Sequence, residues 1–136
     1  MTRQTFMLIV IVYGFILGSV MFLLPEFAVS SYAGNPANVH ETSTMRFFGA
    51  LQIGFNFVAL AIRNSSDTKV IRTYLLSSAG ILLGSLGIGL YYVLTKQVPF
   101  LPSNWLDVII WISLGLGSLY FWNKETEIDK RQLKFH

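Results

Sequence analysis

Apolar residues occupy four long segments of the chain, and short polar stretches separate them. The segments cover residues 6–24, 47–62, 74–94 and 106–122. A helix needs about 20 apolar residues to cross a hydrocarbon core of about 30 Å, because each residue adds about 1.5 Å. The segments lack the alternation of apolar and polar positions that a transmembrane strand requires. The pattern therefore predicts four membrane-spanning helices.

Residues at the ends of these segments are those that membrane interfaces favour. Arg46 and Arg63 flank the second segment, and their aliphatic stems can lie along apolar surface while their charges reach water. Trp105 and Trp122 bracket the fourth segment, as expected for an interfacial aromatic belt. We expect an all-α integral membrane protein in which residues 1–136 form a single domain, an antiparallel four-helix bundle.

The first segment also has the position of a signal peptide, which is a second interpretation. Its uncharged run of 19 residues is longer than the apolar core of a signal peptide, which has about 7 to 15 residues. We therefore expect residues 6–24 to remain as a membrane span.

Composition agrees with a membrane protein and excludes several other classes. The 136 residues are 53% hydrophobic and 12% charged, whereas a soluble domain carries about 25% charged residues. The chain has no cysteine, which excludes a disulfide scaffold, a thiolate metal site and a cysteine nucleophile. The net charge is +3, but the basic residues form no patch with interleaved aromatics, so we expect no nucleic-acid partner.

The basic residues predict the orientation in the membrane. Arg46 and Lys96 fall on one side of the predicted bundle. The other eight of the ten Lys and Arg residues fall on the side of both termini: Arg3, Arg63, Lys69, Arg72, Lys124, Lys130, Arg131 and Lys134. By the positive-inside rule, both termini lie in the cytoplasm.

One face of the second segment carries polar residues at helical spacing. Arg46, Gly49, Gln52 and Asn56 recur at intervals of three or four and so share one face. In lipid, the two amides need hydrogen-bonding partners, so this face must point into the bundle. The amides either hold helices together or line a small polar cavity that orients a ligand. Both interpretations remain open, although an amide cannot act as a general acid or base.

The stretch of 21 residues from Pro25 to Met45 is the longest connection, and it has enough chain to fold over the end of this polar face. The candidate ligand site is therefore predicted on the extracytoplasmic side. Its residues are His40, Glu41, Arg46, Gln52 and Asn56.

Simpler roles are available to the ionisable residues on that side. Arg46 and Asp107 both lie at predicted helix starts, where they can form a structural ion pair. His40 and Glu41 can act as an acid and base pair near lipid headgroups, which is a further alternative. Adjacent side chains point in different directions, so we predict no metal site. The sequence identifies no catalytic set and no cofactor.

Small residues recur four positions apart and mark helix-packing faces. These residues are Gly14 with Gly18, Gly80 with Gly84, and Ser113 with Gly117. The faces can meet within the chain, in a homo-oligomer or against a protein partner, and the sequence leaves all three open.

Pro25-Glu26 follows the first segment, Met45-Arg46-Phe47-Phe48-Gly49 leads into the second, and the last two segments are rich in glycine. With these features the chain resembles the small four-helix bacterial membrane proteins grouped as DoxX-like. The resemblance implies four helices in a bacterial inner membrane. It also implies, for some members, a role as a subunit or partner of a membrane redox enzyme.

We therefore expect a non-enzymatic protein of the lipid bilayer that serves as an accessory or interaction subunit, with a protein partner or as a homo-oligomer. The alternative is binding of a small lipophilic ligand, quinone- or lipid-like, within the bundle. A proton-coupled transporter is disfavoured because the four segments contain no mid-span carboxylate.

Overall fold

The computed structural model describes residues 1–34, 36–97, 99, 101 and 104–133, and within these ranges every regular element is a helix. The helices are α1 (Arg3–Leu23), α2 (Pro25–Ala33), α3 (Val39–Ile62), α4 (Thr68–Leu94) and α5 (Asn104–Leu133). All except α2 are long and apolar enough to cross a membrane. The predicted all-helical class with four long apolar helices is confirmed. Lys134, one of the basic residues counted above, lies outside the described ranges.

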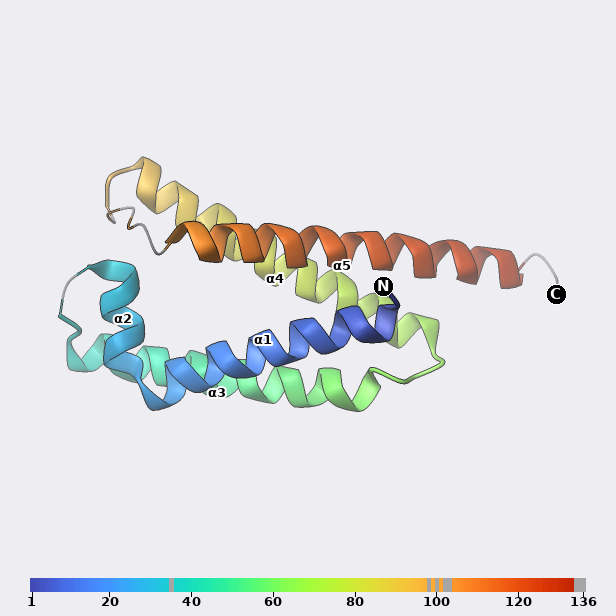
Figure 1. The fold of residues 1–136 in the computed structure, drawn as a ribbon, viewed down its shortest axis with the longest axis horizontal. Helices are drawn as coiled ribbons and strands as arrows, with labels where there is room; N and C mark the ends of the chain where they lie inside the picture. Colours follow the sequence, from blue (N-terminus) through green and yellow to red (C-terminus); the bar gives the residue numbers. More distant parts are fainter. Residues whose placement is uncertain (35, 98, 100, 102–103, 134–136) are drawn as a thin grey trace.

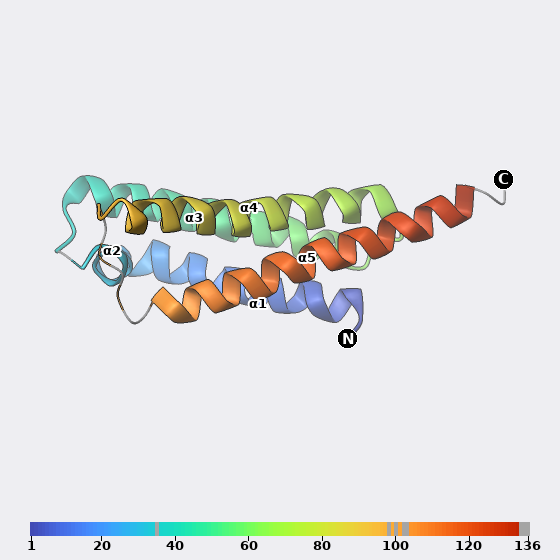
Figure 2. The same ribbon diagram turned by 90° about the horizontal axis from the view of Figure 1, so that it is seen from above.

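The long helices pack as two pairs (Figure 1). α1 lies along α3, and α4 lies along α5, whereas contacts between the two pairs are sparse. Figure 2 shows that α3 and α4 lie on one side of the molecule, whereas α1 and the first part of α5 lie on the other, and α5 crosses toward the side of α4 in its later turns. The packing therefore has two levels: tight within each pair and looser between pairs.

Side-chain caps determine where the helices begin. The Thr2 hydroxyl accepts a hydrogen bond from the Thr5 N–H at the start of α1. Asn38 and Glu41 form a capping box, with each side chain accepting the other residue's backbone N–H at 2.9 Å. The Asp67 carboxylate accepts two backbone N–H groups at the start of α4, at 2.8 and 3.3 Å. Each cap satisfies donors that the first helical turn leaves unpaired.

The connection between the first two predicted spans is largely helical, which the hydropathy pattern did not indicate. α2 is a helix of 9 residues that begins at Pro25, where a missing N–H costs nothing. α3 begins at Val39, eight residues before the predicted start at residue 47, because the capping box starts it among polar residues. Arg46 therefore lies inside α3 and not at its beginning.

The last two long helices also extend beyond the predicted spans. α4 begins at Thr68 instead of residue 74, directly after its Asp67 cap. α5 continues past residue 122 to Leu133, so its final turns include the charged C-terminal segment. Hydropathy identifies only the apolar part of a helix, so it does not predict the polar turns at the ends of α4 and α5.

The two pairs join most closely at the end of the bundle that contains Arg3, which we call the Arg3 end. The ring of Phe6 on α1 stacks on that of Phe121 on α5, with centroids 4.9 Å apart. The ring of Phe55 on α3 stacks on that of Tyr74 on α4 at 5.4 Å. The buried aliphatic and thioether side chains that pack with these rings are Met7, Val10, Ile11, Ala59, Ile71, Leu75 and Leu114. One apolar core thus includes all four long helices.

A polar clamp lies beside this core. The Arg3 guanidinium donates one hydrogen bond to the Glu125 carboxylate and another to the Ser65 carbonyl, each at 3.1 Å. Glu125 is only 8% exposed in its side chain. One arginine thereby connects α1, α5 and the turn between α3 and α4.

Candidate functional site

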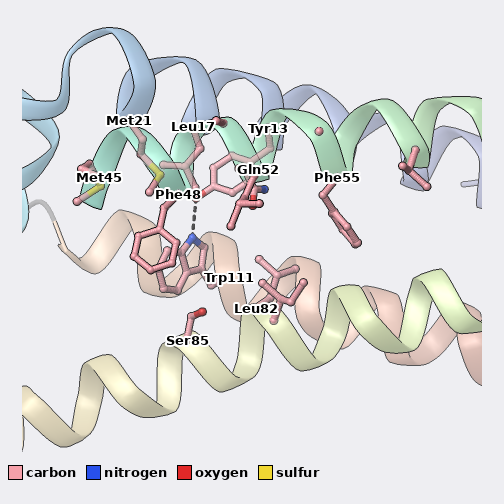
Figure 3. Close-up of a pocket in the computed structure, with 15 residues that line it drawn as sticks. Tyr13, Leu17, Met21, Met45, Phe48, Gln52, Phe55, Leu82, Ser85 and Trp111 are labelled. Atoms are coloured by element: carbon pink, nitrogen blue, oxygen red, sulfur yellow. Dashed lines mark hydrogen bonds between the residues drawn. The ribbon is translucent and has the colours of Figure 1, made fainter. Parts of the chain in front are cut away.

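Toward the opposite end, which carries α2 and which we call the α2 end, the two pairs enclose a cleft. Its volume is about 890 Å³. This value lies within the range of about 300–1,000 Å³ typical of small-molecule sites. Its walls include Tyr13, Leu17 and Met21 of α1, Met45, Phe48, Gln52 and Phe55 of α3, Leu82 and Ser85 of α4, and Trp111 of α5 (Figure 3).

A hydrogen bond closes the cleft along the side where α1 faces α5. Trp111 Nε1–H donates to the Tyr13 hydroxyl at 2.6 Å, drawn as a dashed line in Figure 3. Buried Trp N–H and Tyr O–H groups need such partners. The lining residues Leu51 and Val58 of α3 and Ile81 of α4 are exposed. The cleft is therefore accessible from outside along α3 and α4.

The chemistry of the cleft suits binding more than reaction. Aliphatic, aromatic and thioether side chains form most of its wall, and Lys, Arg, His, Asp and Glu do not occur among the described residues that line it. The polar side chains are Tyr13, Gln52, Ser85 and Trp111. Such a lining can bury an apolar molecule and orient it through a few hydrogen bonds.

A polar recess lies at the inner end of the cleft. It has a volume of about 30 Å³, and Tyr13, Gln52, Asn56 and Ser78 line it together with apolar residues. Asn56 is 1% exposed, and its Nδ2 donates to the backbone carbonyl of Gln52 at 2.6 Å. The recess is large enough for one water molecule, whose share of liquid volume is about 30 Å³. It can equally receive a small polar group of a ligand.

The structure brings together two of the five predicted ligand-site residues. Gln52 lines both the cleft and the recess, and Asn56 lines the recess. His40, Glu41 and Arg46 are exposed residues of α3 that do not line the cleft. The Glu41 side chain is already engaged in the capping box. The amides thus sit at the site, while the three ionisable residues lie apart from it.

The predicted ion pair of Arg46 with Asp107 is not formed within the described parts of the chain, where these side chains lie more than 4 Å apart. Arg46 lies inside α3 and is exposed, whereas Asp107 is half-buried in the first turn of α5. Among the described residues, no group of three or more His, Asp or Glu side chains could hold a metal ion.

Tyr13 and Trp111 are the site residues that sequence reasoning missed. Tyrosine and tryptophan prefer the ends of membrane spans, yet both residues lie in the middle of apolar segments. A mid-span aromatic residue with a polar group needs a buried partner, so these two positions carried a usable signal. Their pairing across 98 positions of the chain could not be read from spacing.

Three of the small residues predicted to pack do face neighbouring helices. A Cβ placed on Gly14 would overlap the side chain of Asn56 from α3. A Cβ on Gly18 would lie 3.1 Å from the carbonyl oxygen of Gly49, and one on Gly117 would lie 2.5 Å from a phenylalanine ring of α1. Glycine at these positions allows the helices to approach closely.

The remaining small residues face no neighbour of this kind. Gly80 and Gly84 are exposed on α4, and a Cβ on either would have no atom within 4 Å among the described residues. Ser113 is exposed on α5, and its hydroxyl donates to the carbonyl of Ile109 one turn earlier. The face of α4 that contains Gly80 and Gly84 is therefore open to an external contact.

Comparison with known proteins identifies a family but no activity. A family model described as a domain of unknown function, DUF8292, matches residues 8–133. No curated protein and no solved structure matches the chain. The resemblance to DoxX-like proteins stays a prediction.

Proposed function

We propose a function for this chain, which belongs to the DUF8292 family, from the geometry of its cleft. The protein is an integral membrane protein that holds a small lipophilic molecule, lipid- or quinone-like, between its two helix pairs. The observation that carries this proposal is the cleft of about 890 Å³ with an apolar wall and a polar recess at its inner end.

The shape of the cleft fits an elongated molecule. Its lining runs along α3 from Met45 to Val58, which corresponds to about 20 Å at about 1.5 Å per residue. That length is about two thirds of a hydrocarbon core of about 30 Å. A chain-like or ring-and-tail lipophile can therefore lie along α3, with the amides of Gln52 and Asn56 available to water in the recess or to a polar group of the ligand.

The basic residues support a defined orientation for this bundle. The Arg3 end lies in the cytoplasm, because most Lys and Arg residues gather there. The cleft then opens into the extracytoplasmic half of the bilayer, below α2. A reporter enzyme that works only in the cytoplasm should be active when it is fused after the C-terminus. Activity of a reporter that works only on the outer side would overturn the orientation.

Quenching of Trp111 fluorescence by a brominated lipophile tests the binding function. Replacing Trp105 and Trp122 by phenylalanine leaves Trp111 as the single tryptophan of the 3 in the chain. In non-ionic detergent micelles, ω-bromohexadecanol should quench Trp111 in a saturable manner, because the indole ring lines the cleft.

A matched pair of α4 variants identifies the site of quenching. Ser85→Phe places a ring in the cleft, whereas Ser77→Phe adds the same ring at an exposed α4 position that does not line it. Saturable quenching should be lost in Ser85→Phe and kept in Ser77→Phe. Equal, non-saturable quenching in all three proteins would show only micelle partitioning and would refute the proposal.

The accessory-subunit function remains a second proposal because one observation favours it. The exposed Gly80 and Gly84 form a small-x-x-x-small pattern with open space in front of it, and such faces associate closely with other membrane helices. Gly84→Ile should abolish co-purification of a partner helix or a second copy, whereas Ser113→Ile on α5 should not. Unchanged association in Gly84→Ile would remove this support.

A further inference from the structure

A second cavity lies next to the cleft, between α4 and α5. Its volume is about 340 Å³, which again falls within the range of about 300–1,000 Å³ for small-molecule sites. Ser85 and Trp111 line both this cavity and the cleft. The two spaces are therefore neighbours that share part of their lining.

One carboxylate distinguishes the second cavity from the cleft. Asp107 lines it and is half-buried in the first turn of α5. Lys and Arg do not occur among the described residues that line either space. Within the described ranges, Asp107 also forms no ion pair within 4 Å.

Aromatic rings complete the surroundings of this carboxylate. Tyr92 of α4 and Trp111 of α5 line the same cavity, and Asp107 and Trp111 share one face of α5 because they are four residues apart. Most other lining residues are aliphatic, among them Leu86, Ile88, Leu90, Val93 and Val108. An anionic group that lines a cavity together with tryptophan and tyrosine side chains can attract an ammonium ion, through charge and through cation–π contact with the rings.

We propose that the second cavity binds the ammonium headgroup of an amphiphile whose apolar tail lies in the adjacent cleft. This inference rests on the proposed binding function and names the class of ligand. Asp107 is the counter-ion, Trp111 and Tyr92 contact the ammonium group, and the tail passes beside Trp111 and Ser85. In the proposed orientation the first turn of α5 lies near the outer interface, so the headgroup is at the interface and the tail points to the midplane.

Competition between amphiphiles with one tail and different headgroups tests the ligand class. Bound ω-bromohexadecanol is displaced from the single-tryptophan protein by hexadecylammonium, hexadecanol or hexadecyl sulfate. We expect hexadecylammonium to act at about tenfold lower concentration than hexadecanol, which corresponds to about 1.4 kcal/mol. Hexadecyl sulfate should be the weakest competitor, because its charge repels that of Asp107.

Two carboxylate variants serve as the matched pair. Asp107→Asn should abolish the preference, because the counter-ion is removed while the shape of the side chain is kept. Hexadecylammonium and hexadecanol should then displace the probe at similar concentrations. Glu26→Gln removes another first-turn carboxylate, which is exposed on α2 and lines neither cavity. This control should keep the full preference.

The outcomes separate the inference from the function on which it rests. If the three competitors act equally on the single-tryptophan protein with Asp107 intact, or if Asp107→Asn keeps the preference, the ammonium site is refuted while the cleft still binds lipophiles. If ω-bromohexadecanol itself does not bind, or binds without dependence on Ser85, the proposed function fails. The comparison of the three competitors on the single-tryptophan protein with Asp107 intact decides between these outcomes even if Asp107→Asn does not fold.

Lysophosphatidylethanolamine distinguishes the source of the headgroup. It carries an ammonium group beside a phosphate, as a membrane lipid does. Displacement at a concentration similar to that of hexadecylammonium would support a membrane lipid as the ligand. Displacement by hexadecylammonium alone would support a lipophilic amine, and either result supports the ammonium site.

Discussion

The Arg3 end and the α2 end of the bundle use the same four long helices but pack them differently. At the Arg3 end, large side chains such as Phe6, Phe121 and Leu75 meet between the pairs and are buried. At the α2 end, α4 presents Ser85 opposite Gln52 and Met45 across the cleft. The α4 wall consists of Ser85 together with Ile81 and Leu82, and these side chains leave the space toward α3 unfilled. A packed core and an open site thus coexist along the same four helices.

The difference concerns only the space between the pairs. Within the first pair, the backbones of α1 and α3 approach closely in the α2 half as well, where a Cβ on Gly49 would lie 2.7 Å from the carbonyl oxygen of Gly18. The close contact between α1 and α3, which we call the closed seam, therefore bounds the open cleft. Four predictions, in order of decreasing effect, test this contrast.

Gly49→Ala should have the largest effect, because it acts on the closed seam. The new Cβ would lie 2.6 Å from the backbone nitrogen of Phe22, and backbone atoms cannot rotate away. Overpacking of this kind costs about 1–3 kcal/mol, and we expect the upper end. Gly84→Ala meets no atom within 4 Å and should instead stabilise by up to about 1 kcal/mol through helix propensity. Unfolding by dodecyl sulfate in mixed micelles measures the change in unfolding free energy of both variants. If both variants were destabilised or both stabilised, the contrast between a packed Gly49 and an open Gly84 would be contradicted.

Leu75→Ala should destabilise the Arg3 end by about 2 kcal/mol, the lower end of the range for buried leucines. The lower end applies because lipid is as apolar as the leucine side chain, so lost packing contacts dominate. Leu75 is 0% exposed, whereas Leu51, on the rim of the cleft, is 54% exposed. Leu51→Ala should change the unfolding free energy by less than about 0.5 kcal/mol. Similar losses in the two variants would show that the α2 end is packed as tightly as the core.

Glu125→Gln should loosen the polar clamp of the Arg3 end by about 1.5 kcal/mol. Breaking a fully buried pair costs about 3–5 kcal/mol, but the Arg3 side chain is 21% exposed, and water offsets part of the loss. Glu127→Gln, on an exposed residue two positions later, is the control and should be neutral. The same unfolding assay applies, and a neutral Glu125→Gln would mean that the clamp contributes nothing to joining the pairs.

Trp111→Phe should have the smallest effect, about 1 kcal/mol, because it removes one hydrogen bond between neutral groups. Tyr13→Phe removes the same bond from the other side, so the double variant should cost little more than either single variant. A double-mutant cycle isolates this coupling. Fully additive losses would indicate that the two side chains do not interact across the cleft.

Hydropathy and charge predicted the four long helices because their apolar runs are long and uninterrupted. The start of α3 was predicted eight residues late, because hydropathy reports only the polarity of side chains and not the hydrogen bonds of the Asn38–Glu41 capping box. The helical α2 was missed for a related reason. Its 9 residues are too few for a span, although Pro25 at the first turn and Gly34 after the last residue are both typical helix boundaries.

The site was predictable only where local spacing determines it. Gln52 and Asn56 share a helix face whatever surrounds them, so their placement facing the bundle followed from the sequence. The prediction that His40 and Glu41 contribute to the ligand site assumed that they lie in a long loop. In the structure these residues lie in the first turn of α3. Pairing of Tyr13 with Trp111 depends on how two distant helices meet, which no local pattern contains.

Distances between the two pairs, measured with spin labels, test the open cleft most directly. The chain contains no cysteine, so a pair of introduced cysteines takes labels at defined positions. Phe47→Cys with Leu94→Cys reports on α3 and α4 at the α2 end, and Leu60→Cys with Val70→Cys reports on the same helices at the Arg3 end. All four positions are exposed, and none of them lines the cleft, the recess or the second cavity described above.

Electron–electron double resonance should give a narrow distance distribution for the Leu60–Val70 pair with or without hexadecanol. The Phe47–Leu94 distribution should be broad without the alcohol and should narrow when it binds, because the ligand fills the space between the pairs. A Phe47–Leu94 distribution that is already narrow and does not respond to hexadecanol would contradict an open, ligand-holding cleft at the α2 end.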